Sequence, residues 1–199
     1  MLRVLSKFIS GVLSPYFIFI YLYALIFLSA YFSTVSLYSF GVLLGVVALF
    51  TTLIPFLVSR INRVNLNDKS SERGPLYMAF GIGNFTLAYY LLSRGIPVWR
   101  ISFLISAILA IITLHLFNKK YNISFHTTMY GVLIGATFII AKFQSFVSLE
   151  IICLIILLGG MLGSARVYLK EHTPGEVITG AILGFSWSYT IAIFTKLLF

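Results

Sequence analysis

Residues 97–117 of this chain, PVWRISFLISAILAIITLHLF, contain a single Asp, Glu, Lys or Arg residue, namely Arg100. A helical run of roughly 20 apolar residues crosses a hydrocarbon core roughly 30 Å thick. Only helices and closed barrels can span a bilayer, because lipid cannot satisfy exposed backbone groups. The sequence therefore predicts an all-α, polytopic transmembrane helix bundle of six to seven helices, formed from this run and others at about 12–33, 38–58, 76–93, 126–143, 149–166 and 174–196.

The composition of the whole chain agrees with a membrane-embedded fold. Of its 199 residues, 60% are hydrophobic and 10% are charged, and the mean hydropathy is +1.03. A soluble domain carries about 25% charged residues. Arg3 and Lys7 precede the first apolar run, as in a secretory signal, but that run continues without a small-residue cleavage pattern. We predict a retained helix and one integral membrane domain covering residues 1–199.

The net charge of +9 points to lipid head groups as partners and not to nucleic acid. The cations lie in short loops between apolar runs, with no basic stripe that could follow a phosphate backbone. Cys153 is the only cysteine, so one chain can build neither a disulfide framework nor a thiolate metal site. We predict no cofactor and no metal.

Polar chemistry gathers on one predicted face of the membrane. Two predicted helices separate the loop at 59–75 from the loop at 118–125, and two more separate the latter from the loop at 166–173, so the three loops share a face. Ionisable groups near hydrocarbon are costly and usually functional. Guanidinium, ammonium and imidazole groups together suit a phosphate. The shared face carries two imidazoles and three candidate phosphate ligands, namely His126, His172, Lys69, Arg73 and Arg166.

Three spaced motifs lie in these loops. Residues 68–75, DKSSERGP, place Lys before Arg and Pro in a compact form, and residues 123–126, ISFH, pair Ser with His. Residues 165–176, ARVYLKEHTPGE, place five residues between Arg and His and three between His and Glu. In order and spacing these motifs resemble those of the type 2 phosphatidic acid phosphatase superfamily, which includes bacterial lipid phosphatases and vanadium haloperoxidases. The family motifs are Lys, Arg and Pro; Pro-Ser-Gly-His; and Ser-Arg, five residues, His, three residues, Asp.

The resemblance covers about residues 68–185 and implies a core like the haloperoxidase and acid phosphatase helical bundle. It implies a metal-independent lipid phosphate phosphatase in which His172 attacks phosphorus to form a phosphohistidine. Glu176, in place of the family's Asp, would orient that imidazole, and His126 would protonate the leaving oxygen. The substrate would be phosphatidate, phosphatidylglycerophosphate, an isoprenyl diphosphate or a lipid A phosphate. The phosphoryl oxygens would be bound by Lys69, Arg73, Ser124 and Arg166.

Plainer interpretations of the same residues stay open at this point. Thr173 and Glu176 also match a capping box, and Ser124 matches a helix N-cap. Lys69 and Arg73 are also typical of charges that set topology or anchor the chain to lipid. Two other functions fit the same basic face: a lipid phosphotransferase, or a non-catalytic transporter or flippase of anionic lipids.

Two further predictions concern location and packing. We expect the inner membrane of a bacterium, and the excess of Lys and Arg on the motif face favours its cytoplasmic side. Small residues spaced four apart let helices approach closely. This pattern occurs on the two helices that begin near the histidines, and it predicts that they pack together and bring both imidazoles to a common pocket. The residues concerned are Gly131, Gly135, Gly180 and Gly184.

Overall fold

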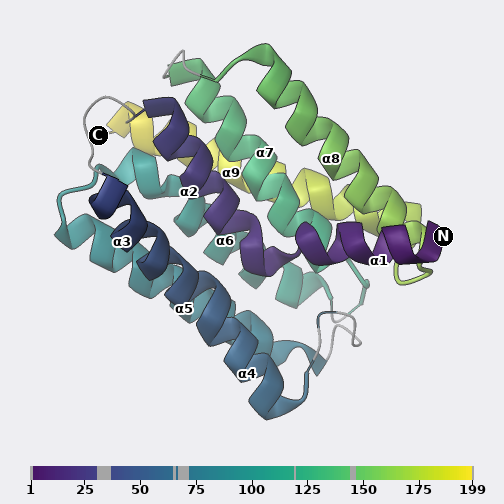
Figure 1. Cartoon of the computed structure of the whole chain (residues 1–199). Helices are drawn as coiled ribbons and strands as arrows, with labels where there is room; N and C mark the ends of the chain where they lie inside the picture. Colours follow the sequence, from purple (N-terminus) through teal and green to yellow (C-terminus); the bar gives the residue numbers. More distant parts are fainter. Residues whose placement is uncertain are drawn as a thin grey trace.

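The computed structural model describes residues 2–30, 37–64, 66, 72–118, 120–143 and 147–198. Within these ranges all regular structure is helical, which confirms the predicted all-α class. The elements, in chain order, are α1 (Leu2–Val12), α2 (Pro15–Ala30), α3 (Leu37–Ala48), the π-helical turn η1 (Leu49–Leu53), α4 (Ile54–Asn62), α5 (Gly74–Ser93), α6 (Val98–Phe117), α7 (Phe125–Phe143), α8 (Leu149–Tyr168) and α9 (Pro174–Leu198) (Figure 1).

Four helical segments are long and apolar enough to cross a membrane, as expected for an integral membrane protein. They are the continuous run from α3 to α4, and α6, α8 and α9. The pair α1 and α2, bent by 60°, makes a fifth if it is counted as one span. The structure thus supports four to five spans where the sequence predicted six to seven. The excess lies in α5 and α7, whose apolar runs are interrupted by polar residues such as Asn84 and Thr137.

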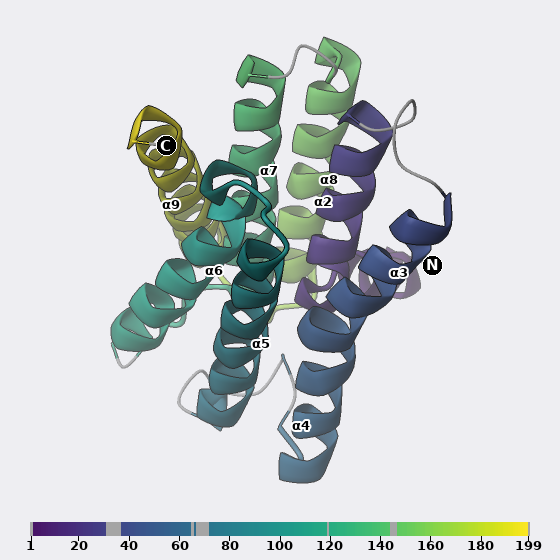
Figure 2. The same ribbon diagram turned by 90° about the vertical axis from the view of Figure 1, so that its left-hand side faces the viewer.

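Helix α7 lies at the centre of the bundle, and most of its residues are buried, including His126, Thr127 and Thr128. The contact between α7 and α9 is the most extensive between any two helices in the described part of the chain. Figure 2 shows α9 at one edge of the bundle and α3 with α4 at the opposite edge. The polar residues of α7 are therefore enclosed by other helices and not turned toward lipid.

Glycine allows α7 and α9 to touch backbone to backbone, as predicted. A Cβ atom at Gly184 would stand 1.9 Å from the carbonyl oxygen of Thr128, and one at Gly131 would stand 2.3 Å from that of Ala181. Only hydrogen fits at those positions. The close approach places the start of α7 beside the start of α9, where the backbone N–H of Ser124 donates to the Glu176 carbonyl oxygen at 3.4 Å. The second and third sequence motifs are thereby brought together.

Helix α1 lies across one end of the bundle, against α8 (Figure 1). Its polar residues, Arg3, Ser6, Lys7 and Ser10, recur at a spacing that places them on one side of a helix. Ser10 on this side is buried, while the apolar residue Phe8 is exposed. Pro15 begins α2 after the bend, because its fixed φ and missing N–H suit the first turn of a helix. The bend turns the polar side of α1 toward the end of the bundle.

Candidate active site

The structure brings six of the seven predicted site residues to the same end of the bundle. The charges of Arg73, Arg166 and His172 all act on the imidazole of His126, so these four side chains form one cluster. Ser124 and Glu176 join it through the backbone hydrogen bond between them. Lys69, the seventh, lies outside the described residues. The cluster draws on six places in the chain: the residue before α5, the segment entering α7, the first turn of α7, the last turn of α8, the segment leading into α9 and the first turn of α9.

His172 is held by two acceptors on the same ring nitrogen. Its Nδ1 lies 3.0 Å from the Asn122 carbonyl oxygen and 3.2 Å from Oε2 of Glu176. Because both partners are acceptors, Nδ1 carries the proton of the neutral ring. The Nε2 lone pair is then free, and Nε2 is buried with no hydrogen-bond partner among the described residues. This is the tautomer in which Nε2 can act as a nucleophile.

The loop that presents Asn122 is itself fixed by a side chain. Asn118 accepts a hydrogen bond from the Ile123 N–H at 2.7 Å through Oδ1 and donates to the Ile123 carbonyl oxygen at 3.2 Å through Nδ2. The same Nδ2 lies 3.3 Å from the Tyr77 hydroxyl, which links the loop to α5. The Asn122 carbonyl is therefore aimed at His172 by a network that joins α5, α6 and α7.

Glu176 has both of the roles that its position in the sequence allows. Its Oε2 accepts a hydrogen bond from the Thr173 N–H at 2.9 Å, and its own N–H donates to Thr173 Oγ1 at 3.3 Å. This reciprocal pair is a capping box at the start of α9. The same Oε2 contacts His172 at 3.2 Å. Capping fixes the carboxylate, and the fixed carboxylate orients the imidazole.

Arg166 is almost fully buried and is held by two groups. Its Nη1 donates to Oγ of Ser10 on α1 at 3.0 Å and forms an ion pair with Glu171. Arg73, at the start of α5, is also buried and lies within electrostatic range of Arg166. Like charges held close together away from water strongly favour an anion between or beside them.

Burial and these two cations lower the pKa of His172. Desolvation is the largest cause, followed by the charges of Arg166 and Arg73, while the hydrogen bonds to Glu176 and Asn122 act in the opposite direction. A lowered pKa keeps the imidazole neutral near pH 7, since an unperturbed histidine titrates at about 6.5. The environment therefore favours the nucleophilic form of the ring.

Buried polar atoms in this cluster lack a hydrogen-bond partner in the described part of the chain, among them Ser124 Oγ, His126 Nδ1 and His172 Nε2. The Ser124 carbonyl oxygen accepts from the Thr128 N–H and from the Thr128 hydroxyl, but its own hydroxyl caps nothing. The alternative interpretation of Ser124 as a side-chain N-cap is thus wrong. Buried polar groups are normally satisfied, so three such atoms together indicate a place for a polar ligand.

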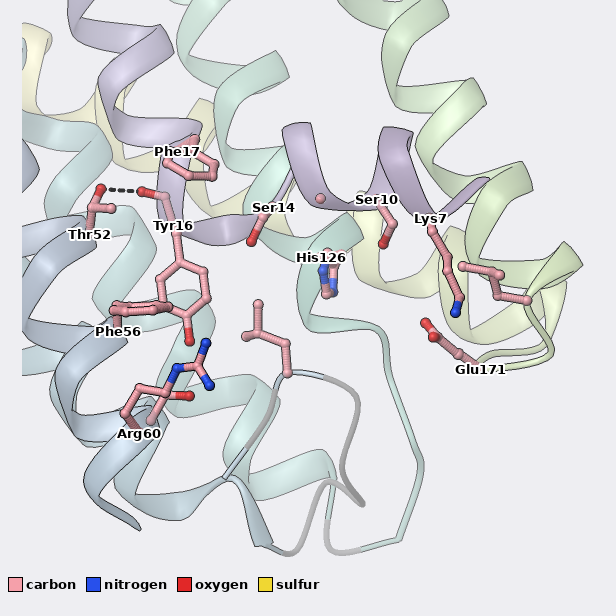
Figure 3. A pocket seen from close by; sticks show the side chains of 14 residues that line it. Lys7, Ser10, Ser14, Tyr16, Phe17, Thr52, Phe56, Arg60, His126 and Glu171 are labelled. Atoms are coloured by element: carbon pink, nitrogen blue, oxygen red, sulfur yellow. Dashed lines mark hydrogen bonds between the residues drawn. The ribbon is translucent and has the colours of Figure 1, made fainter. Parts of the chain in front are cut away.

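A cavity of about 690 Å³ adjoins the cluster between α1, α2, α4 and the start of α7 (Figure 3). His126 lines it, and Glu171 and Lys7 face it from one side while Arg60 and Tyr16 face it from the other. Of the six described site residues, only His126 is part of this wall. A ligand in the cavity therefore meets the cluster at His126.

Sequence reasoning missed several residues that shape this site. Ser10 lies 156 positions from its partner Arg166, and no local pattern links the two. Asn122 acts through its backbone carbonyl, which residue type does not reveal. Glu171 was within reach, because it is an acidic residue between Arg166 and His172 in the third motif. Comparisons of the chain with protein-family models, curated proteins and solved structures found no match.

Proposed function

We propose that this protein is a lipid phosphate phosphatase of the bacterial inner membrane that acts through a phosphohistidine. The observation that carries the proposal is the buried cluster in which Ser124 Oγ, His126 Nδ1 and His172 Nε2 lack partners among the described residues beside two buried guanidinium groups. A phosphate supplies acceptor oxygens for hydroxyl and guanidinium donors and an electrophilic phosphorus for an imidazole. The three motifs that resemble the phosphatidic acid phosphatase superfamily support the same reaction.

In the first step, His172 Nε2 attacks phosphorus and the bond from phosphorus to the lipid oxygen breaks. The charge that spreads over the phosphoryl oxygens is stabilised by Arg73, Arg166 and Ser124, with Lys69 as a further ligand. Burial and the charges of Arg166, Arg73 and His172 lower the pKa of His126, and the negative charge of the bound phosphate acts in the opposite direction. The protonated ring gives its proton to the departing oxygen. The products of the step are a lipid alcohol, or a lipid monophosphate from a diphosphate, and a phosphohistidine.

In the second step, water attacks the phosphohistidine and the bond between phosphorus and nitrogen breaks. His126 takes a proton from the water, which returns it to its starting state. Glu176 and the Asn122 carbonyl hold the proton on Nδ1 of His172 throughout, so Nε2 is the nitrogen that is released with its lone pair. Inorganic phosphate leaves. Apart from the water and the substrate, the groups that act in this cycle are side chains and backbone groups of this protein.

A groove of about 740 Å³ between α7, α8 and α9 fits the hydrocarbon tail of such a substrate. Its lining is mainly apolar and includes Ile134, Ile156 and Ile182. One end of the groove is bounded by Thr127 and Pro174, which are neighbours of His126 and His172 in the chain. The groove thus ends beside the segments that carry the two histidines, and we propose that the tail occupies it while the phosphate is bound. Phosphatidate, phosphatidylglycerophosphate, isoprenyl diphosphates and lipid A phosphates all have this form.

Phosphate release in detergent micelles containing EDTA tests the proposal. We expect His172→Ala to lose activity by about 10³-fold or more, because the nucleophile is removed. His115→Ala is the matched control, since His115 is an imidazole on α6 that contacts the Tyr77 ring and is outside the cluster. The control should stay within about threefold of the unmodified protein. Full activity of His172→Ala would defeat the mechanism.

A further inference from the structure

The cavity beside His126 has a second polar end that the reaction above does not use. This end is built from α2, η1 and α4, outside all three motifs. The Arg60 guanidinium lies 5.1 Å from the centre of the Phe56 ring and faces the cavity (Figure 3). The Tyr16 hydroxyl lies near Ser59 and close enough to Arg60 for the Arg60 charge to act on it. A cation and a hydroxyl thus share one wall.

Neighbouring helices fix these two side chains in place. The Thr52 hydroxyl donates to the Tyr16 carbonyl oxygen at 2.5 Å, which ties η1 to the start of α2. The Tyr16 ring packs against Phe80 at 5.3 Å and against Phe56 at 6.1 Å between ring centres. Arg60 is exposed and stands over the Phe56 ring on the wall of the cavity.

The size of the cavity exceeds what one phosphate needs. A volume of about 690 Å³ is in the range of pockets that hold whole ligands of about 300–1,000 Å³. His126 lies on the wall between the Arg60 end and the Lys7 end (Figure 3). A head group whose reacting phosphate lies at His126 would extend along this cavity. Arginine with a hydroxyl is a donor set suited to phosphate oxygens.

We infer that Arg60 and Tyr16 form a subsite for a second phosphate group on the same head group. The inference rests on the proposed phosphatase and narrows its substrates to lipids with two phosphates, joined either directly as a diphosphate or through a short spacer. Arg60 binds the oxygens of the second phosphate, and the Tyr16 hydroxyl donates to one of them. The reacting phosphate stays at the histidine cluster. A lipid with one phosphate leaves the subsite empty and binds less tightly.

Binding of non-hydrolysable phosphonates to the purified full-length protein in detergent tests the subsite without any turnover. The probes are methylphosphonate, methylenediphosphonate and propane-1,3-diphosphonate. The diphosphonate whose spacing matches the subsite should bind about tenfold or more tightly than methylphosphonate, and Arg60→Gln should remove that difference. Arg63→Gln is the matched control, because Arg63 is three residues further along and is exposed like Arg60, but is absent from the cavity wall. It should keep the preference.

Each outcome decides the matter. A preference that survives Arg60→Gln, or falls equally with Arg63→Gln, overturns the subsite, as does wild-type protein that binds mono- and diphosphonates alike. Tyr16→Phe, which keeps the ring packing, should lower the preference for the diphosphonate over methylphosphonate in part. This variant replaces Arg60→Gln as the test if Arg60→Gln does not remain monodisperse. Preference for the shorter diphosphonate indicates a lipid diphosphate, and preference for the longer one indicates two separate phosphates. If diphosphonate binding depends on Arg60 but no phosphate is released from a lipid diphosphate or from a lipid with two separate phosphates, the subsite is supported and the proposed phosphatase activity is wrong.

Discussion

Helices α7 and α9 meet each other without a gap, yet together with α8 they border an open groove. Both regions contain glycines, and Gly184 and Gly160 show how their surroundings differ. A Cβ atom at Gly184 would collide with the Thr128 carbonyl oxygen at 1.9 Å, whereas one at Gly160 would meet nothing within 4 Å. The closed contact positions the two histidine-bearing segments, and the open one leaves room for an apolar chain. In one protein, glycine thus serves both to bring backbones together and to keep a space empty.

After removal of the nucleophile His172, the largest effect within the closed region should come from His126→Ala. Loss of a general acid lowers the rate by about 10²–10⁴-fold. A lipid alkoxide needs the proton, whereas nitrophenolate leaves without one, so p-nitrophenyl phosphate hydrolysis should fall much less than lipid phosphate hydrolysis. Phosphate release from both substrates measures the difference. Equal losses for the two would show that His126 binds phosphate and donates no proton.

Gly184→Ala should break the closed contact directly. Overfilling a packed interface costs about 1–3 kcal/mol, and moving a catalytic group by about 1 Å lowers a rate by about 10²-fold. We expect a lower unfolding temperature in detergent and activity reduced by about that factor. Gly81→Ala is the control, because a Cβ atom there meets nothing within 4 Å. If both variants behave like the unmodified protein, the backbone contact does not hold the site.

The closed region is also where the sequence was most informative. Gly131, Gly135, Gly180 and Gly184 recur at a helical spacing, and that pattern alone predicted the contact that the structure contains. The convergence of His126 with His172 followed from the same pattern and from counting helices. The contact between α7 and α9 and the convergence of the two histidines could both be predicted, because each depends only on residue type and spacing along the sequence.

The open region could not be predicted in the same way. Gly160 has the same side chain as Gly184, and only the position of neighbouring helices shows that it borders a groove. The sequence shows Arg60 only as a cation after an apolar run, and its place on a cavity wall appears only in the structure. Six to seven spans were predicted and the structure supports four to five, because polar residues such as Asn84 and Thr137 interrupt the apolar runs of α5 and α7. Each of these depends on tertiary packing.

Glu176→Gln should change the pH dependence of the reaction more than its maximum rate. The nucleophile is neutral His172, so kcat/KM rises as the pH passes upward through its pKa. Glu176 raises that pKa against the larger lowering effects of burial, Arg166 and Arg73. Its loss should therefore move the acid limb of the profile to lower pH. Thr173→Ala, which removes the cap at a cost of about 1 kcal/mol but keeps the carboxylate, should lower stability and leave the profile unchanged. A limb that moves to higher pH in Glu176→Gln would contradict this role.

The smallest effect should come from filling the open groove with Gly160→Leu. The new side chain enters empty space, so stability should be nearly unchanged. A lipid tail displaced from the groove returns to a bilayer or micelle that is equally apolar, so little free energy is lost. We expect KM to rise roughly threefold for a long-chain lipid phosphate, less than about 1 kcal/mol, and to stay the same for a short-chain soluble analogue. Because Gly184→Ala should reduce activity on both substrates alike, the chain-length dependence separates the two kinds of glycine. An equal rise in KM for both chain lengths would mean that the groove between α7, α8 and α9 does not receive the tail.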